Sequence, residues 1–334
     1  MKIDAFNHIF PTALFDVLPD YMPNAQIDRL RSITTLWDID ARLRLLDEFG
    51  EDFCQILSLS QPPLDSIAGP DDTPHLARVA NDGMAAICRA HLDRFPGYIM
   101  SLPMNNPDAA VIEIDRNMEE HGVLGAQIHS NVSGKALDAS EYFQIFERMA
   151  HHGRPVWLHP ARPITHPDYM SEEISEFDIW WGMGWPMETS TAMARLVFSG
   201  MFDKLPHLKV ICHHWGAYIP HAEGRLKHHW PGRKSQSDKY QYEPIGSKLK
   251  RPVIDYFKDF LGDTAMFGAL AASQAGLDFF GAGNSVFATD CPYDREGGRM
   301  LIRDTLEVME NLRCTGEDRQ NMFEGNIKRL LDLK

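Results

Sequence analysis

Four short apolar stretches of this chain each deliver a possible metal ligand at the point where the stretch ends. The four side chains are His8, His159, His214 and Asp290. Imidazole nitrogens combined with a carboxylate oxygen are the ligand set of catalytic zinc, and of manganese or iron where oxygen ligands contribute more. If these side chains meet, they indicate a metal site for hydrolytic or lyase-type chemistry.

The residues around these ligands bear on where each side chain points. His159 precedes Pro160, and a residue before proline is held extended, which fixes the direction of the imidazole. Strand alternation predicts that His213 points to the side opposite His214. Asp290 follows a buried-type run, where a carboxylate needs a cation or hydrogen-bond donors; a helix cap is the alternative.

An apolar run that ends in a polar ligand is typical of a buried parallel strand whose carboxyl end reaches a rim. The chain alternates such runs with helix-like segments. We expect strands at residues 2–8, 53–60, 98–104, 125–131, 155–160, 209–214, 260–266 and 285–290. We expect helices starting at Asp38 and at residues 73–93, 107–121, 139–152, 188–201, 218–228, 271–280 and 298–312.

Ligands that lie as far apart in the chain as residues 8 and 290 can meet only if the strands close on themselves. We therefore predict an α/β fold, a single (β/α)8 TIM barrel over residues 1–334 with extended βα loops and its chemistry at the carboxyl ends of the strands. An open doubly wound sheet would carry a glycine-rich turn after strand one, and residues 8–11 are His-Ile-Phe-Pro. Residues 228–251, polar and locally basic, are expected to form a lid or an oligomer contact.

Composition limits the classes of partner. The formal net charge is −14, which argues against a nucleic-acid surface and against attraction to a membrane. No apolar stretch approaches membrane-spanning length, and the first residues form a strand-like run without the pattern of a signal peptide. The five cysteines are scattered and form no C-x-x-C pair, which favours reduced thiols and a cytoplasmic location.

Several motifs, specific as a set, are spread over almost the whole chain. They are Ile3-Asp4-x-x-x-His8, Trp37-Asp38-x-x-x-Arg42, Gly125-x-Gln127-Ile128, His159-Pro160, Arg195-Leu196, His214-x-Gly216, Gly224-Arg225 and Thr289-Asp290-x-Pro292. With these motifs the chain resembles the amidohydrolase superfamily. Within it, the chain is similar to the branch of 2-amino-3-carboxymuconate-6-semialdehyde decarboxylase and the aromatic-acid decarboxylases.

The resemblance implies a metal site and also shows one departure from it. Such proteins commonly open with His-x-His on strand one, and Phe6 occupies the first of these positions here. The implied site is mononuclear, with one divalent metal, Zn²⁺ or Mn²⁺, held by His8, His159 and Asp290, and with His214 as a further ligand nearby. Strand four offers no lysine at residues 127–129, so a lysine-bridged binuclear centre is not expected.

The resemblance also implies one substrate-binding residue, Arg42, and the sequence around His159 offers further candidates. Arg42 matches the position of the arginine that binds the substrate carboxylate in the semialdehyde decarboxylase, and its fork suits a carboxylate; the alternative is a helix-surface arginine paired with Asp38. Arg162 is a second candidate for binding an anion. Trp181 and Trp185 follow the His159 strand, where they either line a pocket for a planar ligand or pack within the connection.

We therefore expect non-oxidative decarboxylation of an aromatic or unsaturated carboxylic acid, a small-molecule substrate. Asp290 or His214 would protonate the carbon that loses CO₂. Two alternatives stay open: a metal-dependent hydrolase or hydratase with His214 as general base, and a catalytically silent binding barrel, which Phe6 suggests. The long connections after strands one and six favour a homodimer or homotetramer.

Overall fold

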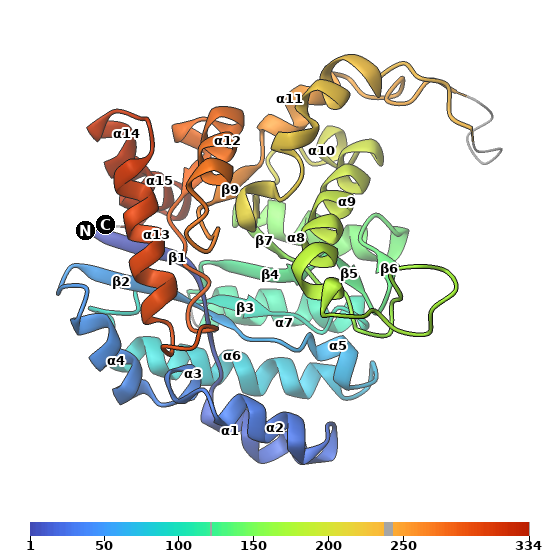
Figure 1. The fold of residues 1–334 in the computed structure, drawn as a ribbon. Coiled ribbons are helices and arrows are strands. Elements are labelled where there is room, and N and C mark those ends of the chain that lie inside the picture. Colours follow the sequence, from blue (N-terminus) through green and yellow to red (C-terminus); the bar gives the residue numbers. More distant parts are fainter. Residues whose placement is uncertain (121, 237–242, 334) are drawn as a thin grey trace.

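The structure is a computed structural model that describes residues 1–120, 122–236 and 243–333. Parallel strands alternate with helices along the chain, and strand neighbours follow chain order (Figure 1). The strands of the ring are β1 (Lys2–Ile9), β2 (Phe53–Leu59), β3 (Ile99–Ser101), β4 (Gly125–His129), β7 (Val156–His159), β8 (Val210–Cys212), β9 (Leu261–Asp263) and β10 (Ser285–Val286). The short pair β5 (Asn131–Val132) and β6 (Lys135–Ala136) forms a separate hairpin after β4.

Backbone contacts close these strands into a barrel. One sheet runs from β3 through β4, β7, β8 and β9 to β10, and a second pairs β1 with β2. The two sheets meet on one side at a parallel bridge between Leu57 and Tyr98. On the other side Ala5 N donates to Phe287 O at 2.8 Å, and Asp290 N donates to Phe6 O at 3.1 Å. The predicted (β/α)8 barrel is therefore confirmed.

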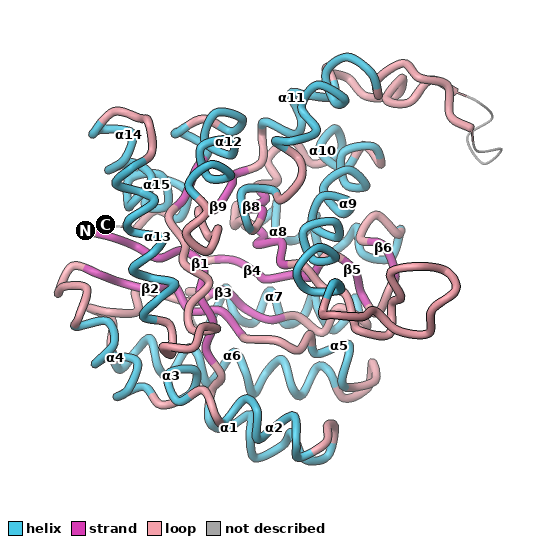
Figure 2. The backbone as a smooth tube through the Cα atoms, in the orientation of Figure 1, coloured by secondary structure: helices cyan, strands magenta, loops and turns pink. Residues whose placement is uncertain are grey.

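Helices surround the strands (Figures 1 and 2). The longer ones are α2 (Asn24–Arg31), α4 (Ile39–Asp47), α6 (Thr73–Ala90), α7 (Pro107–Glu120), α8 (Phe143–His151), α9 (Trp185–Phe198), α12 (Leu270–Phe280) and α13 (Arg299–Asn311). The shorter ones are α1 (Thr12–Val17), α3 (Thr34–Trp37), α5 (Leu64–Ile67), α10 (Met201–Lys204), α11 (Val253–Lys258), α14 (Gly316–Gln320) and α15 (Asn326–Leu331). Their apolar faces pack on the outer side chains of the strands and form the larger hydrophobic core.

A second, smaller core fills the inside of the barrel. It contains Ile3, Trp157 and Ile211 from the strands, closed off by Ile327 and Leu331 of α15. The indole of Trp157 donates to the Ala5 carbonyl at 3.1 Å. The barrel is therefore a packed core and not a pore, which leaves its carboxyl-end rim as the place for polar side chains.

Three predicted elements differ from the observed ones. Strand β3 is shorter than residues 98–104, since Pro103 has no N–H to continue the ladder. Strand β10 stops well before Asp290, whose φ of 62° turns the chain. The helix predicted at residues 218–228 is broken into two short pieces, η5 (Pro220–Ala222) and η6 (Arg225–His229).

The segment 228–251 projects from the barrel as an arm, apart from residues 237–242, which lie outside the described residues (Figure 1). Two stretches of it pair in antiparallel fashion: Gly232 N donates to Ile245 O at 3.0 Å, and Ile245 N to Arg233 O at 2.9 Å. Trp230 anchors the base of the arm on Phe198, with the ring centroids 4.9 Å apart. Across the described ranges, no helix combines the length and the apolar character that crossing a membrane requires.

Candidate metal centre

Four buried side chains converge at the carboxyl ends of the strands. They are His8, His159, His213 and Asp290, and one potential ligand atom from each lies within 4.8 Å of those of the others. His159 is the last residue of β7 and His8 the last but one of β1, while His213 and Asp290 follow β8 and β10. The barrel thus brings together groups that are up to 282 positions apart in the chain. Of the four predicted ligands, three belong to this group and His214 does not.

Asp290 is the centre of the group. Its Oδ1 lies 2.9 Å from His8 Nε2 and 3.3 Å from His213 Nε2, and its Oδ2 lies 3.6 Å from His214 Nε2. Burial alone would raise the pKa of Asp290, but the imidazoles of His213, His214 and His8 outweigh burial and hold the pKa well below its usual range. Asp290 is therefore a carboxylate over the physiological pH range, as a metal ligand requires.

The two adjacent histidines have different environments. The Nδ1 of His213 lies 2.5 Å from Asp263 Oδ2, at the end of β9, and the other oxygen of Asp263 accepts from the backbone N of His214 at 2.9 Å. Burial lowers the pKa of His213, but the carboxylates of Asp263 and Asp290 more than reverse this and raise the pKa to about 10. For His214, burial and the neighbouring His213 lower the pKa.

The alternation predicted for His213 and His214 is wrong. Both imidazoles lie against Asp290, and their centroids are 3.8 Å apart. Strand β8 ends at Cys212, and the chain enters left-handed backbone at His214, with a φ of 56°. The rule that neighbouring side chains point to opposite faces applies only within a strand. The His-His doublet was therefore a signal for two site residues.

The donor set fits a divalent cation. Nitrogen and carboxylate oxygen ligands at this spacing are those of mononuclear zinc or manganese sites. The Nε2 of His213 is buried and has no hydrogen-bond partner among the described residues. The same holds for both ring nitrogens of His214. Buried nitrogens without partners are costly, and a bound cation removes that cost for the atoms it contacts. The group therefore fits one metal ion.

Aromatic side chains from the start of α9 and from the loops after β9 and β10 surround the group. The ring of Trp185 stands edge-on to that of His159, with the ring centroids 5.4 Å apart. The centroid of Tyr293 lies 5.8 Å from that of His8, and the centroid of Phe267 lies 5.3 Å from that of His214. Tyr293 and Phe267 carried no sequence signal. Asp263 did carry a sequence signal, since it ends an apolar strand in the same way as the predicted ligands. Trp181 lies farther out, 6.5 Å from Trp185, and is 49% exposed.

Arg42 lies below the metal group and not at its mouth. It is fully buried, and all five of its N–H groups donate within the protein. The acceptors are Gln55 Oε1 (2.9 Å), Thr35 O (3.3 Å), Cys291 Sγ (3.1 Å), Asn7 Oδ1 (3.1 Å) and His8 O (2.7 Å). No N–H is left for a substrate carboxylate, and no ion pair with Asp38 forms. In this structure Arg42 therefore holds β1 and the loop after β10 in position. We had predicted that it contacts the substrate.

Arg162 lies beside the aromatic wall. Its backbone carbonyl accepts from the indole of Trp185 at 3.3 Å, its Nη2 donates to Pro167 O at 3.1 Å, and its Nη1 lies 3.9 Å from Glu188. Its Nε is buried with no partner among the residues that the structure describes. This guanidinium therefore keeps donor capacity for an anion.

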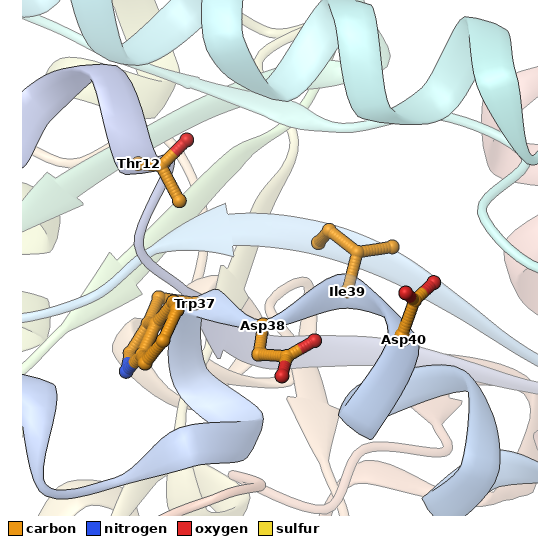
Figure 3. A pocket seen from close by; sticks show the side chains of 5 residues that line it. All are labelled: Thr12, Trp37, Asp38, Ile39 and Asp40. Carbon is orange, nitrogen blue, oxygen red and sulfur yellow. The ribbon is translucent and has the colours of Figure 1, made fainter.

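One hollow of the surface lies outside the barrel (Figure 3). It measures about 280 Å³ and is lined by Thr12, Trp37, Asp38, Ile39 and Asp40. Asp38 caps α4 there by accepting from Ala41 N at 3.0 Å. None of these residues belongs to the metal group, so the hollow is separate from the chemistry described above.

Comparisons with known proteins agree with this geometry. A family model described as amidohydrolase matches residues 3–333. The gamma-resorcylate decarboxylase of Polaromonas sp. (strain JS666) is 31% identical over 94% of this chain and 93% of its own length. The 2-amino-3-carboxymuconate-6-semialdehyde decarboxylase of Dictyostelium discoideum is 34% identical over 89% of this chain and 77% of its own length.

A solved structure gives the same fold. It is a dihydroxybenzoic acid decarboxylase from Polaromonas sp. JS666 with bound manganese and the inhibitor 2-nitroresorcinol. It superposes with a TM-score of 0.77 and 28% sequence identity, covering 99% of this chain and 97% of that one. The barrel thus has a counterpart in a protein of known structure, and that protein binds manganese.

Proposed function

This chain belongs to the amidohydrolase family, and from that premise we propose that it is a metal-dependent carboxy-lyase acting as one unit over residues 1–334. The reaction is the non-oxidative decarboxylation of an aromatic carboxylic acid of the dihydroxybenzoate type. The observation that carries the proposal is the buried group of histidines around Asp290 at the carboxyl ends of the strands. The decarboxylases with 31% and 34% identity support the same reaction class.

His8, His159 and Asp290 would hold one divalent cation, Mn²⁺ in the first place and Zn²⁺ as the alternative. The cation would draw electron density from the substrate carboxylate and from an adjacent oxygen. Burial and the neighbouring His8 lower the pKa of His159, so its neutral ring offers a lone pair. The Pro160 carbonyl lies 2.6 Å from His159 Nδ1, where it can accept the Nδ1 proton, hold the orientation of the ring and leave the lone pair on Nε2.

His214 is the residue that would deliver the proton. In the reaction a ring carbon gains a proton, its bond to the carboxylate breaks, and the electron pair of that bond restores the aromatic ring as CO₂ leaves. Asp290 and His214 were the two predicted proton donors. The low pKa of Asp290 keeps its carboxyl group unprotonated, so the adjacent His214 is the donor of the two. Because its pKa is lowered, the imidazolium form of His214 is a stronger acid than a free imidazolium, which favours transfer of its proton to the ring carbon.

The surroundings suit a planar anion. Trp185 would cover one face of an aromatic ring, with Trp181 farther out at the mouth. Arg162, with its unpartnered Nε, would bind a second anionic or phenolic oxygen at the edge of the site.

The test is product analysis with 2,6-dihydroxybenzoate as substrate. The enzyme, dialysed against Mn²⁺ or Zn²⁺, is incubated in D₂O; we expect CO₂ release and one deuterium on the ring carbon. The variant His214→Asn should keep its metal and lose turnover by about 100-fold or more, the size of a general-acid contribution. His151→Asn, an exposed histidine, is the control. Uptake of solvent oxygen in place of CO₂ release, or no reaction across dihydroxybenzoates and muconate semialdehydes, would overturn the proposal.

We also propose that the protein is a homodimer or homotetramer, with the arm at residues 228–236 and 243–251 as a contact. A two-stranded hairpin alone in water is only marginally stable, so a projecting one is expected to pack against another subunit. Light scattering should give a multiple of the 38.0 kDa chain mass; a monomer would refute this. The five free thiols support a cytoplasmic location.

A further inference from the structure

Phe6 fills the place next to His8 on the inner side of strand β1. The two residues share one face, since they are two positions apart in a strand. Phe6 is fully buried, and its ring centroid lies 4.5 Å from that of His213, 5.2 Å from that of His8 and 5.7 Å from that of His159. The ring therefore contacts all three imidazoles of the metal group but offers no ligand atom.

His213 supplies a nitrogen on the side of the group that Phe6 leaves without one. Its ring is stacked on His159 with centroids 5.3 Å apart, and it is 1% exposed. Its Nδ1 is held by Asp263, so when a cation displaces the proton from Nε2 the other proton stays on Nδ1 and Nε2 offers its lone pair. That Nε2 points at Asp290, 3.3 Å from Oδ1, and has no hydrogen-bond partner among the described residues.

We propose that His213 is the fourth protein ligand of the cation and replaces the strand-one ligand lost at Phe6, with Asp263 as the residue that orients it. A carboxylate, a histidine and a metal in series is a recurrent arrangement that fixes the tautomer of the ring and makes the ligand nitrogen more basic. The roles of the two adjacent histidines then separate: His213 binds the metal, and His214 remains free to carry a proton. This inference rests on the proposed function only in requiring a divalent cation.

The packing of Phe6 agrees with this exchange. Its edge lies against the rings of His213 and His8, at interplanar angles of 82° and 70°. A second ligand from β1 and the imidazole of His213 would compete for the same side of the cation. An apolar ring at position 6 removes the competitor and at the same time holds the His213 ring in place.

The test is metal affinity, measured by chelator competition with Mn²⁺ on protein freed of metal, with metal content by elemental analysis. His213→Gln should weaken binding by about 100-fold or more, and Asp263→Asn by about 10- to 100-fold. His214→Gln, a change at the next residue, should leave the affinity within about threefold of wild type. Thermal unfolding of each metal-free variant shows whether it still folds.

A second-site variant decides the matter. If Phe6 and His213 exchange roles, adding Phe6→His to His213→Gln should restore most of the lost affinity. Wild-type affinity in His213→Gln would overturn the inference, and so would a larger loss in His214→Gln than in His213→Gln, or no rescue by Phe6→His in a folded protein. Metal binding that depends on His213 without any CO₂ release would reject the proposed reaction and keep the ligand assignment.

Discussion

Replacing Arg42 by methionine tests whether this residue binds substrate or holds the barrel together. The buried guanidinium donates to four oxygen acceptors and one sulfur. Methionine keeps much of the volume but leaves the four oxygens without their donor. At about 1 kcal/mol for each of these four buried hydrogen bonds, the loss is about 4 kcal/mol.

The assay is urea unfolding of the metal-free protein, in parallel with kinetics of the metal-loaded enzyme. We expect Arg42→Met to lower the free energy of unfolding by about 4 kcal/mol. Arg44→Met, an exposed arginine on the same helix, should change it by less than about 0.5 kcal/mol. A stability change below about 1 kcal/mol together with a large rise in KM would refute the positioning role and restore Arg42 as a substrate ligand.

Three further outcomes are expected. Burial raises the pKa of the Asp4 carboxyl group from 3.8 to about 6. The folded state therefore keeps the Asp4 proton to higher pH than the unfolded state does. The contribution of Asp4 to stability falls as pH rises from about 4 to 6. The stability of Asp4→Asn relative to wild type, from urea unfolding, should therefore rise by about 3 kcal/mol across that window; a constant difference would contradict the raised pKa. Removing the metal with a chelator should lower the melting temperature, and Mn²⁺ at about 100 times its Kd should restore about 2.7 kcal/mol; an unchanged melting temperature would argue against a bound cation. Trp185→Ala should raise KM by about tenfold with unchanged metal content, since it removes one aromatic stacking contact. Tyr169→Ala, 71% exposed on the same connection, is the control, and an equal effect of both would remove Trp185 from the site.

The site residues missed by the sequence reasoning were those whose positions depend on contacts between distant segments. Tyr293 reaches His8 only because the loop after β10 turns back over β1, through a bond from His8 N to Cys291 O at 2.7 Å. Arg42 has the sequence context of a helix-surface residue, yet it lies under β1, where its Nη2 donates to Asn7 Oδ1 and His8 O. Local patterns carry no information on such packing.

The sequence by itself determined the strands, their order and three of the metal-group residues. An apolar run that ends in His8, His159 or Asp290 buries its apolar side chains and still exposes the polar one to the site only if the run is a buried strand with the polar residue at its carboxyl end. Only the tertiary structure decided between His213 and His214, because the chain leaves the strand after Cys212 and the ring directions then depend on left-handed backbone and on Asp263, 50 positions away. Strand periodicity predicts side-chain direction within an element, while the turn that follows takes its shape from the contacts that the closed barrel provides.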